Sequence, residues 1–463
     1  MRRMWTGVAV LCLAAGFASA QQTVAWTVKP EWVRAHEEFL ASDAMSGRGS
    51  ATHDEEITAT YVASEFMAYG LKPAPGMTGY IQAAEVIAPQ LDGHSTLSAG
   101  AVTLEEAKDF DLLMSPGTPA SGPLVQIAAS DAAAAKVDRG AAILVTGATN
   151  SDAAIAALTA LRRKGAALVL LVQTSGTENL LGMLGGKTRT PIRLAEAPAP
   201  RASSTVALLR PDAAAKLMAL SGTTVSATVH ELPQAAPRKT YNAVGYLPGS
   251  DPASGTILLS AHLDHLGIGR AVNGDAIYNG ANDDAAGTTA VLELAHALAA
   301  GPRLKRNVLF VCYGSEEIGE LGSTYFGEHP PVPLKDLVTN LEFEMIGSQD
   351  PKMPKGVLLF TGWERSNLGP TLKEHGALLG PDPYPEQHFF ERSDNYALAL
   401  KGVVAHTAAG WGTPSTYHQP NDDLAHLDIA FMTTAIQSLV EPVRWLASSD
   451  FRPAWNAGGQ PSR

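Results

Sequence analysis

The sequence predicts an α/β protein whose main domain is a three-layer, doubly wound and mostly parallel sheet with helices on both faces. Between Tyr241 and Leu446, short apolar runs alternate with helical stretches. The predicted strands cover residues 256–260, 308–313, 337–345, 356–360 and 402–406, and the predicted helices cover residues 286–300, 366–379 and 429–447. Continuously apolar strands indicate a sheet that is covered on both faces. Ligands of such sheets bind at the carboxyl ends of the strands.

A change of composition predicts a second, smaller domain inserted into the first. Residues 101–233 are rich in Ala, Gly, Thr and Ser and contain neither Trp nor Tyr. Within them, apolar runs at 141–145 and 166–172 flank a helical stretch at 153–163, which is typical of a strand, helix, strand unit. We therefore expect residues 21–100 and 234–450 to form the main domain, 101–233 to form the insert, and 451–463 to be a tail.

Composition and charge narrow the possible partners. The 463-residue chain carries a net charge of −12 and has no Lys/Arg-rich block, which argues against nucleic acid and anionic membranes as partners. Residues 1–20 resemble a secretory signal, with Arg2 and Arg3 before an apolar stretch that ends in Ala18-Ser19-Ala20. We expect an exported protein, periplasmic or extracellular, without a membrane anchor. Cys312 would then be the single cysteine, and its apolar surroundings predict a buried side chain.

Residues that can bind a metal or transfer a proton lie where the predicted strands end. His262 and Asp264 follow one strand, and the adjacent acids Glu316 and Glu317 follow the next. An imidazole and a carboxylate two residues apart can share one side of a strand end, and one of two adjacent acids can bind a metal while the other acts as a base. Surface acids are common, so neither cluster is specific by itself.

Three further acidic or histidine-bearing clusters extend this pattern. Asp283 and Asp284 precede a helix, where one of them is expected to be an ordinary helix cap. Glu342 and Glu344 share one face of an apolar strand, where burial is costly without a cation. His418 lies in a turn-rich loop. Histidines and carboxylates without a usable thiolate favour catalytic rather than structural zinc, in a two-metal hydrolase arrangement.

The order of these motifs over residues 241–428 resembles the co-catalytic zinc aminopeptidase family, which includes bacterial secreted leucyl aminopeptidases, glutamate carboxypeptidases and glutaminyl cyclases. The resemblance implies a zinc-exopeptidase fold with two Zn²⁺ ions, and a protease-associated domain at 101–233. It implies that one zinc is held by His262, Asp283 and Glu344. The second would be held by Asp283, Glu317 and His418. Asp264 would orient His262, and Glu316 would be the general base.

Two positions depart from the family pattern. Glu344 stands where Asp is usual, and Asn395 replaces a His in the segment 392–396. The resemblance implies hydrolysis of N-terminal residues from peptide substrates. A carboxypeptidase, a glutaminyl cyclase and a metal-free binding protein of the same fold are the alternatives, and every expected ligand position here holds a competent residue.

Overall fold

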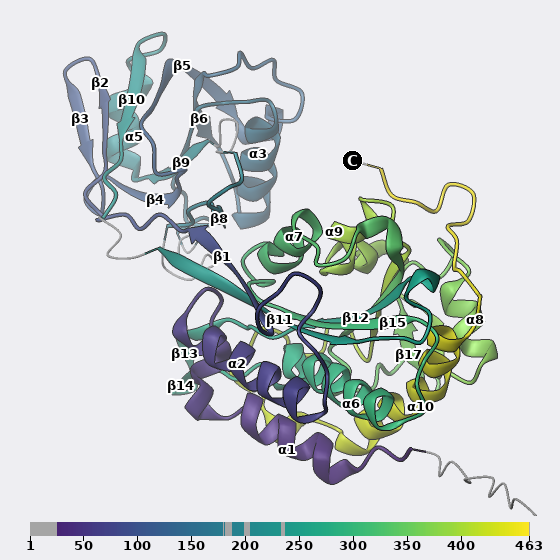
Figure 1. Cartoon of the computed structure of the whole chain (residues 1–463). Coiled ribbons are helices and arrows are strands. Elements are labelled where there is room, and N and C mark those ends of the chain that lie inside the picture. Colours follow the sequence, from purple (N-terminus) through teal and green to yellow (C-terminus); the bar gives the residue numbers. More distant parts are fainter. Residues whose placement is uncertain (1–25, 179, 181–187, 199–203, 233–236, 463) are drawn as a thin grey trace, which may run out of the picture.

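The chain forms two lobes, each built on its own sheet (Figure 1). The computed structural model describes residues 26–178, 180, 188–198, 204–232 and 237–462, so the predicted signal segment lies outside it. The larger lobe holds a nine-stranded sheet in the order β18-β17-β19-β16-β12-β15-β11-β1-β8. Among the described residues, no helix combines the length and the apolar composition that crossing a bilayer requires.

The centre of the larger sheet is parallel, and an antiparallel pairing joins the flanking strands to it on each side. The four central strands are β12 (Thr256–His262), β15 (Asn307–Tyr313), β16 (Leu337–Glu344) and β19 (Ala405–Ala409), and they pair with one another in parallel. The flanking strands are β17 (Leu358–Phe360), β18 (Leu379–Pro381), β11 (Arg238–Leu247), β1 (Ile81–Ile87) and β8 (Arg193–Leu194). β17 is antiparallel to β19, and β11, β1 and β8 pair antiparallel on the other side. The predicted mostly parallel sheet therefore describes the centre, because β1 and β11 form a ribbon that leaves for the smaller lobe and returns.

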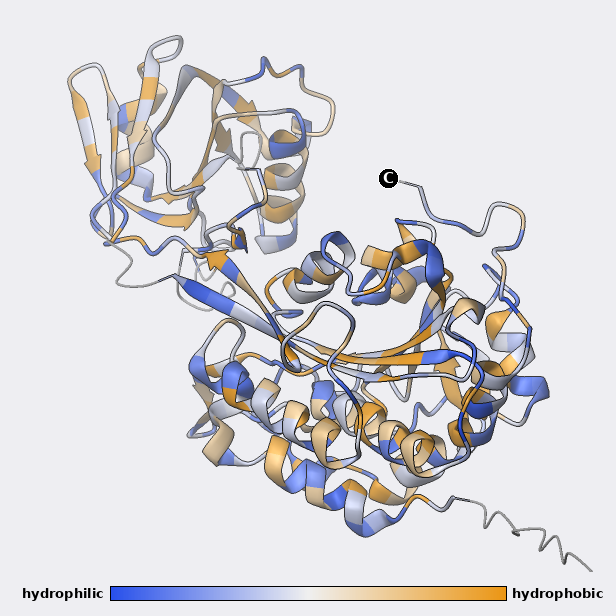
Figure 2. Cartoon of the chain, viewed as in Figure 1, coloured by the Kyte–Doolittle hydropathy of each residue, from blue (hydrophilic) through white to orange (hydrophobic). Residues whose placement is uncertain are grey.

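Helices cover both faces of the larger sheet, as expected of a three-layer fold (Figure 1). One face carries α1 (Pro30–Leu40), α2 (His53–Ala68), α6 (Ala286–Ala300) and α10 (Ile429–Ser448). The other carries α7 (Leu321–Glu328) and α9 (Asn395–Ala399), and α8 (Leu368–Glu374) lies near the β18 edge. The central strands are apolar along most of their length and buried, including the predicted buried Cys312 (Figure 2). The helix expected at 366–379 is shorter, since it ends at Glu374 and the chain turns before it enters β18 at Leu379, and the strand expected at 402–406 begins later, at Ala405.

The smaller lobe is an eight-stranded sheet in the order β3-β2-β10-β5-β6-β7-β9-β4. Its elements are β2 (Thr96–Ala99), β3 (Val102–Glu105), β4 (Phe110–Met114), β5 (Ala120–Ala128), β6 (Ala142–Thr146), α3 (Ser151–Arg163), β7 (Leu168–Val172), β9 (Thr205–Leu209), α5 (Pro211–Met218) and β10 (Thr224–Thr228). The smaller sheet thus begins at Thr96, before the boundary expected at residue 101. β8 lies inside the insert in sequence but pairs with β1 of the larger sheet. The assignment of this lobe as a protease-associated domain stays a prediction.

One buried arginine ties the N-terminal segment to the end of β12. The Arg48 guanidinium donates to the carbonyl oxygens of Leu263 (2.9 Å), Leu40 (2.8 Å), Asn279 (2.6 Å) and Gly280 (2.8 Å). The last two residues lie between the exposed hairpin of β13 (Gly267–Val272) and β14 (Asp275–Tyr278) and the start of α6. Arg48 thus fixes the backbone on both sides of that hairpin.

Replacing Arg48 by Leu should lower the free energy of unfolding by roughly 3–5 kcal/mol, because several buried carbonyl oxygens lose their donor at once. Urea unfolding would measure this. The matched control is Arg34→Leu, since Arg34 is exposed and lies 3.8 Å from an equally exposed Glu38. Equal effects of the two substitutions would contradict the anchoring role of Arg48.

Candidate metal centre

The predicted site residues meet where the central strands end. β12 ends at His262, β15 leads into Glu316 and Glu317, and β16 ends at Glu344. Because these strands are parallel neighbours, their carboxyl ends lie at one edge of the sheet. Asp283 reaches the same place from the turn before α6.

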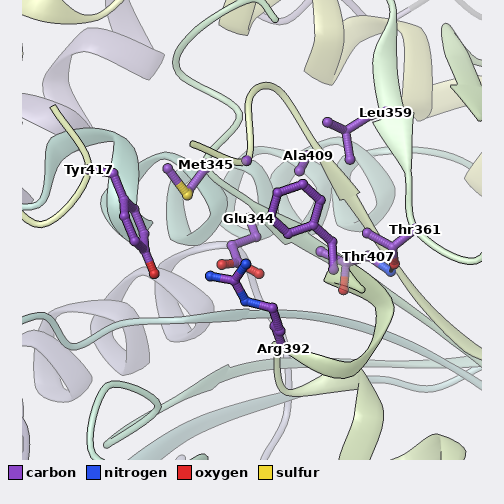
Figure 3. Close-up of a pocket in the computed structure, with 10 residues that line it drawn as sticks. Glu344, Met345, Leu359, Thr361, Arg392, Thr407, Ala409 and Tyr417 are labelled. Atoms are coloured by element: carbon purple, nitrogen blue, oxygen red, sulfur yellow. Dashed lines mark hydrogen bonds between the residues drawn. The ribbon is translucent and has the colours of Figure 1, made fainter. Parts of the chain in front are cut away.

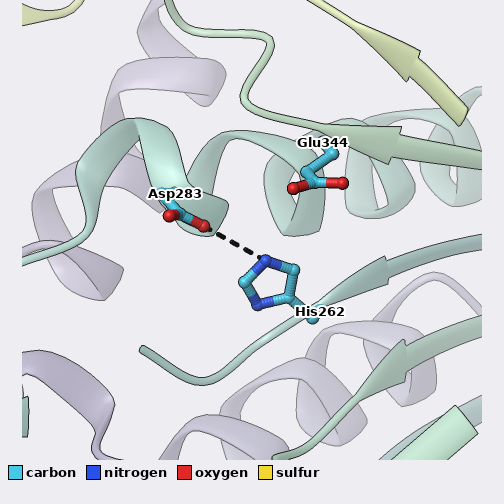
Figure 4. Close-up of side chains that lie close together, drawn as sticks. All are labelled: His262, Asp283 and Glu344. Carbon is cyan, nitrogen blue, oxygen red and sulfur yellow. Dashed lines mark ion pairs between the residues drawn. The ribbon is translucent and has the colours of Figure 1, made fainter. Parts of the chain in front are cut away.

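The first group consists of His262, Asp283 and Glu344 (Figure 4). Each contributes one possible ligand atom, and these atoms lie within 4.8 Å of one another. His262 Nε2 lies 3.2 Å from Asp283 Oδ1 but is buried without a hydrogen-bond partner. A buried imidazole nitrogen and a carboxylate that face each other outside hydrogen-bond geometry fit a cation between them.

The second group shares Asp283 with the first. His418 Nε2 lies 3.2 Å from Asp283 Oδ2 and 3.2 Å from Glu317 Oε2. Asp283 therefore presents one oxygen to each imidazole, as a bridging carboxylate would. The residues fit two cations with a common ligand, and their role in binding zinc stays a prediction.

The possible ligand atoms that lie within 4.8 Å of one another in the second group belong to Asp283, Glu317 and His265, and the sequence predicted no role for His265. His418 contacts Asp283 and Glu317. The fully buried ring of His265 places Nδ1 2.8 Å from Glu317 Oε1, in hydrogen-bond geometry. Glu317 Oε2 remains directed at His418. The tight packing of the ring depends on Gly280, where a Cβ atom would lie 2.5 Å from His265 Cγ. Only the closeness of His265 to Asp264 in the sequence could have indicated its place here.

The charged groups of the centre strongly shift one another's pKa values. Burial disfavours the charged His418 ring, but Asp283 and Glu317 outweigh it and raise the pKa of His418 to about 10. The same competition raises the pKa of His262 well above its ordinary value, with Asp264 and Asp283 as the opposing carboxylates. The pKa of Glu317 is lowered to about 2, because His265 and His418 overcome burial and the charge of Asp283. A cation bound here would compete with the protons on these imidazoles.

Glu316 differs from its neighbour Glu317. Burial raises the pKa of Glu316 well above its ordinary value despite the charge of His262, and the carboxylates of Glu317, Asp394 and Glu344 add to the rise. Its carboxylate accepts no hydrogen bond from the described residues. A carboxylate with a raised pKa that accepts no hydrogen bond is suited to take up a proton.

Asp264 holds the loop that carries both glutamates. Its carboxylate accepts hydrogen bonds from the backbone N–H of Glu316 (3.0 Å) and from the hydroxyl of Ser50 (2.6 Å). It lies 3.7 Å from His262 Nδ1, longer than a hydrogen bond, while the main-chain oxygen of Asp264 lies 3.2 Å from that nitrogen. Asp264 thus contacts the ring mainly through its backbone, and its side chain positions the loop after β15.

Two further aspartates hold Asp283 and its surroundings in place. Asp284 accepts from the backbone N–H of Gly287 (2.9 Å) near the start of α6 and from that of Met345 (2.8 Å) after β16. It therefore plays the capping role expected of one member of this pair. Asp422 accepts from the backbone N–H of Asp283 (3.0 Å) and was not predicted. The two residues are 139 positions apart in the sequence, so the contact forms only in the folded chain.

Of the two acids on β16, Glu344 enters the metal centre and Glu342 does not. Glu342 is buried and accepts hydrogen bonds from the hydroxyls of Ser393 (2.9 Å) and Thr407 (3.2 Å) and from the backbone N–H of Asn395. Burial and the charge of Glu344 raise its pKa to about 8. Asn395, the residue that departs from the family pattern, is buried in this network and does not face the centre as part of either group.

Comparison with known proteins shows that part of this chain is similar to peptidases. Residues 242–441 match the model of peptidase family M28. Leupeptin-inactivating enzyme 1 of Streptomyces exfoliatus is 29% identical over 209 residues, which are 41% of this chain and 44% of that protein. Aminopeptidase YwaD of Bacillus subtilis is 26% identical over 155 residues, 32% of this chain and 33% of that protein. These matches span less than half the length of either relative.

Solved structures show the same fold over nearly the whole chain. The aminopeptidase from Aneurinibacillus sp. strain AM-1 superposes with a TM-score of 0.57 at 18% identity, covering 94% of this chain and 98% of the other. A zinc aminopeptidase from Bacillus subtilis superposes with a TM-score of 0.54 at 16% identity, with the same coverage. At these identities the likeness concerns the fold.

Replacing His265 by Leu should weaken zinc binding at the second group by roughly 10- to 100-fold, because Glu317 loses the donor that orients it. His265→Gln offers an amide N–H in place of Nδ1 and should lose less. Zinc titration against a competing chelator measures both. His329→Gln, which alters an exposed histidine paired with Glu196, is the control. Unchanged affinity in His265→Leu would contradict the orienting role, and equal losses in both variants would make His265 a direct ligand.

Proposed function

We propose that this chain, whose residues 242–441 match the model of peptidase family M28, is an exported aminopeptidase that removes N-terminal residues from peptides with two zinc ions. The observation that carries the proposal is the pair of residue groups that share the buried Asp283 carboxylate. Two imidazoles face its two oxygens, as a co-catalytic pair of cations requires.

The proposed ligands divide between the two ions. His262, Asp283 and Glu344 would hold one, and Asp283, Glu317 and His418 the other. Zinc ions bound there would polarise the scissile carbonyl group and lower the pKa of water. The longer side chain of Glu344, where the family usually has Asp, still brings a carboxylate oxygen within reach of His262 and Asp283.

Glu316 is the proposed general base. It would take a proton from the attacking water onto its carboxylate and return that proton to the leaving amine nitrogen. Asp264 would support this role by holding the backbone of Glu316 through the 3.0 Å hydrogen bond. The raised pKa of Glu316 favours the uptake of this proton.

The charge of the centre suits a free amino terminus. Glu316 and Glu344 offer carboxylates to a substrate α-ammonium, and the relatives with matching sequence include proteins named as aminopeptidases. A carboxypeptidase and a glutaminyl cyclase remain the alternatives within the fold. A free dipeptide, its N-acetyl derivative and a peptide with N-terminal Gln separate the three activities.

Export rests on the segment 1–20. If it is a signal peptide, the mature protein collected from the periplasm or the medium should begin at Gln21, which N-terminal sequencing would establish. A protein that retains Met1 and stays inside the cell would contradict export without affecting the proposed chemistry.

Glu316→Gln should retain both zinc ions while kcat falls at least about 100-fold, because the amide has the shape of the carboxylate but cannot accept the proton. Metal analysis and hydrolysis of Leu-p-nitroanilide measure the two effects. Glu320→Gln is the control, since Glu320 lies in the same loop and outside both metal groups. Full activity of Glu316→Gln would exclude Glu316 as the base.

Zinc binding at pH 7 should release about two protons per chain, because coordination requires neutral imidazoles and both His262 and His418 have raised pKa values. The proton contributed by His418 should no longer be released once the pH has risen through the pKa of that residue, about 10. Calorimetric titration in buffers of different ionisation enthalpy measures the protons released. His418→Ala should release about one fewer. A binding heat that is the same in all buffers would contradict this.

A further inference from the structure

A pocket opens directly beside the metal centre (Figure 3). Glu344 lines it, and Tyr417, which stacks on His418 with 3.8 Å between ring centroids, forms another part of its wall. An occupant of this pocket therefore lies next to the groups proposed to act on the peptide bond. Any substrate group bound there must belong to the residues flanking the scissile bond.

Arg392 brings a cation into this pocket, and Figure 3 shows its guanidinium directed toward the side of Glu344. The guanidinium carbon lies 5.1 Å from the centroid of the Phe389 ring. Among the described residues, no carboxylate oxygen lies within 4.0 Å of a guanidinium nitrogen of Arg392. The nearby Arg365 differs, because it packs on Phe390 and lies 3.7 Å from Glu391 and 3.8 Å from Glu364.

The two threonine hydroxyls of the pocket already have partners. The Thr407 hydroxyl donates within the network of Glu342 and Asn395, and the Thr361 hydroxyl accepts from the backbone N–H of Thr407 at 3.2 Å. Leu359, Met345 and Ala409 supply apolar wall. Glu344 belongs to the first metal group, so a cation there would offset its charge. Apart from Glu344, Arg392 is the one charged residue among the described residues that line the pocket.

We propose that Arg392 binds a carboxylate of the peptide substrate. The planar guanidinium fork matches a carboxylate with two parallel hydrogen bonds, and stacking on Phe389 orders it beforehand. The inference rests on the proposed peptidase function and names the group that the same site selects. The carboxylate is either the side chain of an N-terminal Asp or Glu, or the free α-carboxylate of a dipeptide.

Ratios of kcat/KM in the full-length chain loaded with zinc test the proposal. The first ratio compares Glu-p-nitroanilide with Gln-p-nitroanilide, and the second compares Leu-Gly with Leu-Gly-amide. Because Arg392 is exposed, Arg392→Gln should lower one ratio by about tenfold, mainly through KM. Arg392→Lys, which keeps the charge, should retain part of it. Arg365→Gln is the matched control and should leave both ratios unchanged.

The ratio that falls identifies the source of the carboxylate. If neither ratio falls in Arg392→Gln while the wild-type chain hydrolyses Leu-p-nitroanilide, the proposal is overturned and the peptidase function stands. Charge reversal gives an independent readout, because Arg392→Glu should improve Lys-p-nitroanilide relative to Glu-p-nitroanilide. A wild-type chain inactive on every substrate would overturn the proposed function, and the selection of a carboxylate with it.

Discussion

The buried carboxylate of Asp283 is the constraint on which the site depends. It is almost fully buried, with His262 facing one oxygen and His418 the other. Glu317 and Glu344 crowd the same small volume. Carboxylates so placed are expensive to bury without compensating positive charge. The imidazoles supply that charge when protonated, and the proposed cations would supply more of it.

Hydrogen bonds from the surrounding structure hold this arrangement in place. Asp422 holds the backbone of Asp283, and Asp284 joins the start of α6 to the end of β16. Asp264 holds the loop after β15. Arg48 then ties the backbone around the β13–β14 hairpin to the N-terminal segment. Most of these contacts are hydrogen bonds to backbone groups, so they set the positions from which the proposed ligands project and leave the ligand atoms themselves free.

The sequence predicted the features that follow from local patterns, and it did not predict the contacts between segments that are distant in the sequence. The apolar runs predicted β12, β15 and β16, and acids or histidines at their ends predicted a common edge, because parallel neighbours end together. The contacts of His265 with Glu317 and of Asp422 with Asp283 join distant segments, so no local pattern revealed them. The same reason explains the sheet flanks, since the antiparallel pairing of β1 and β11 depends on where the chain re-enters after the smaller lobe. The early start of that lobe at Thr96 likewise follows from pairing with β10.

Anomalous scattering at the zinc edge from zinc-loaded crystals would test the central claim most directly. We expect two peaks, on opposite sides of the Asp283 carboxylate. One should lie among His262, Asp283 and Glu344, and the other among Asp283, Glu317 and His418. A single peak that leaves one oxygen of Asp283 without metal, or peaks only at other places on the chain, would contradict it.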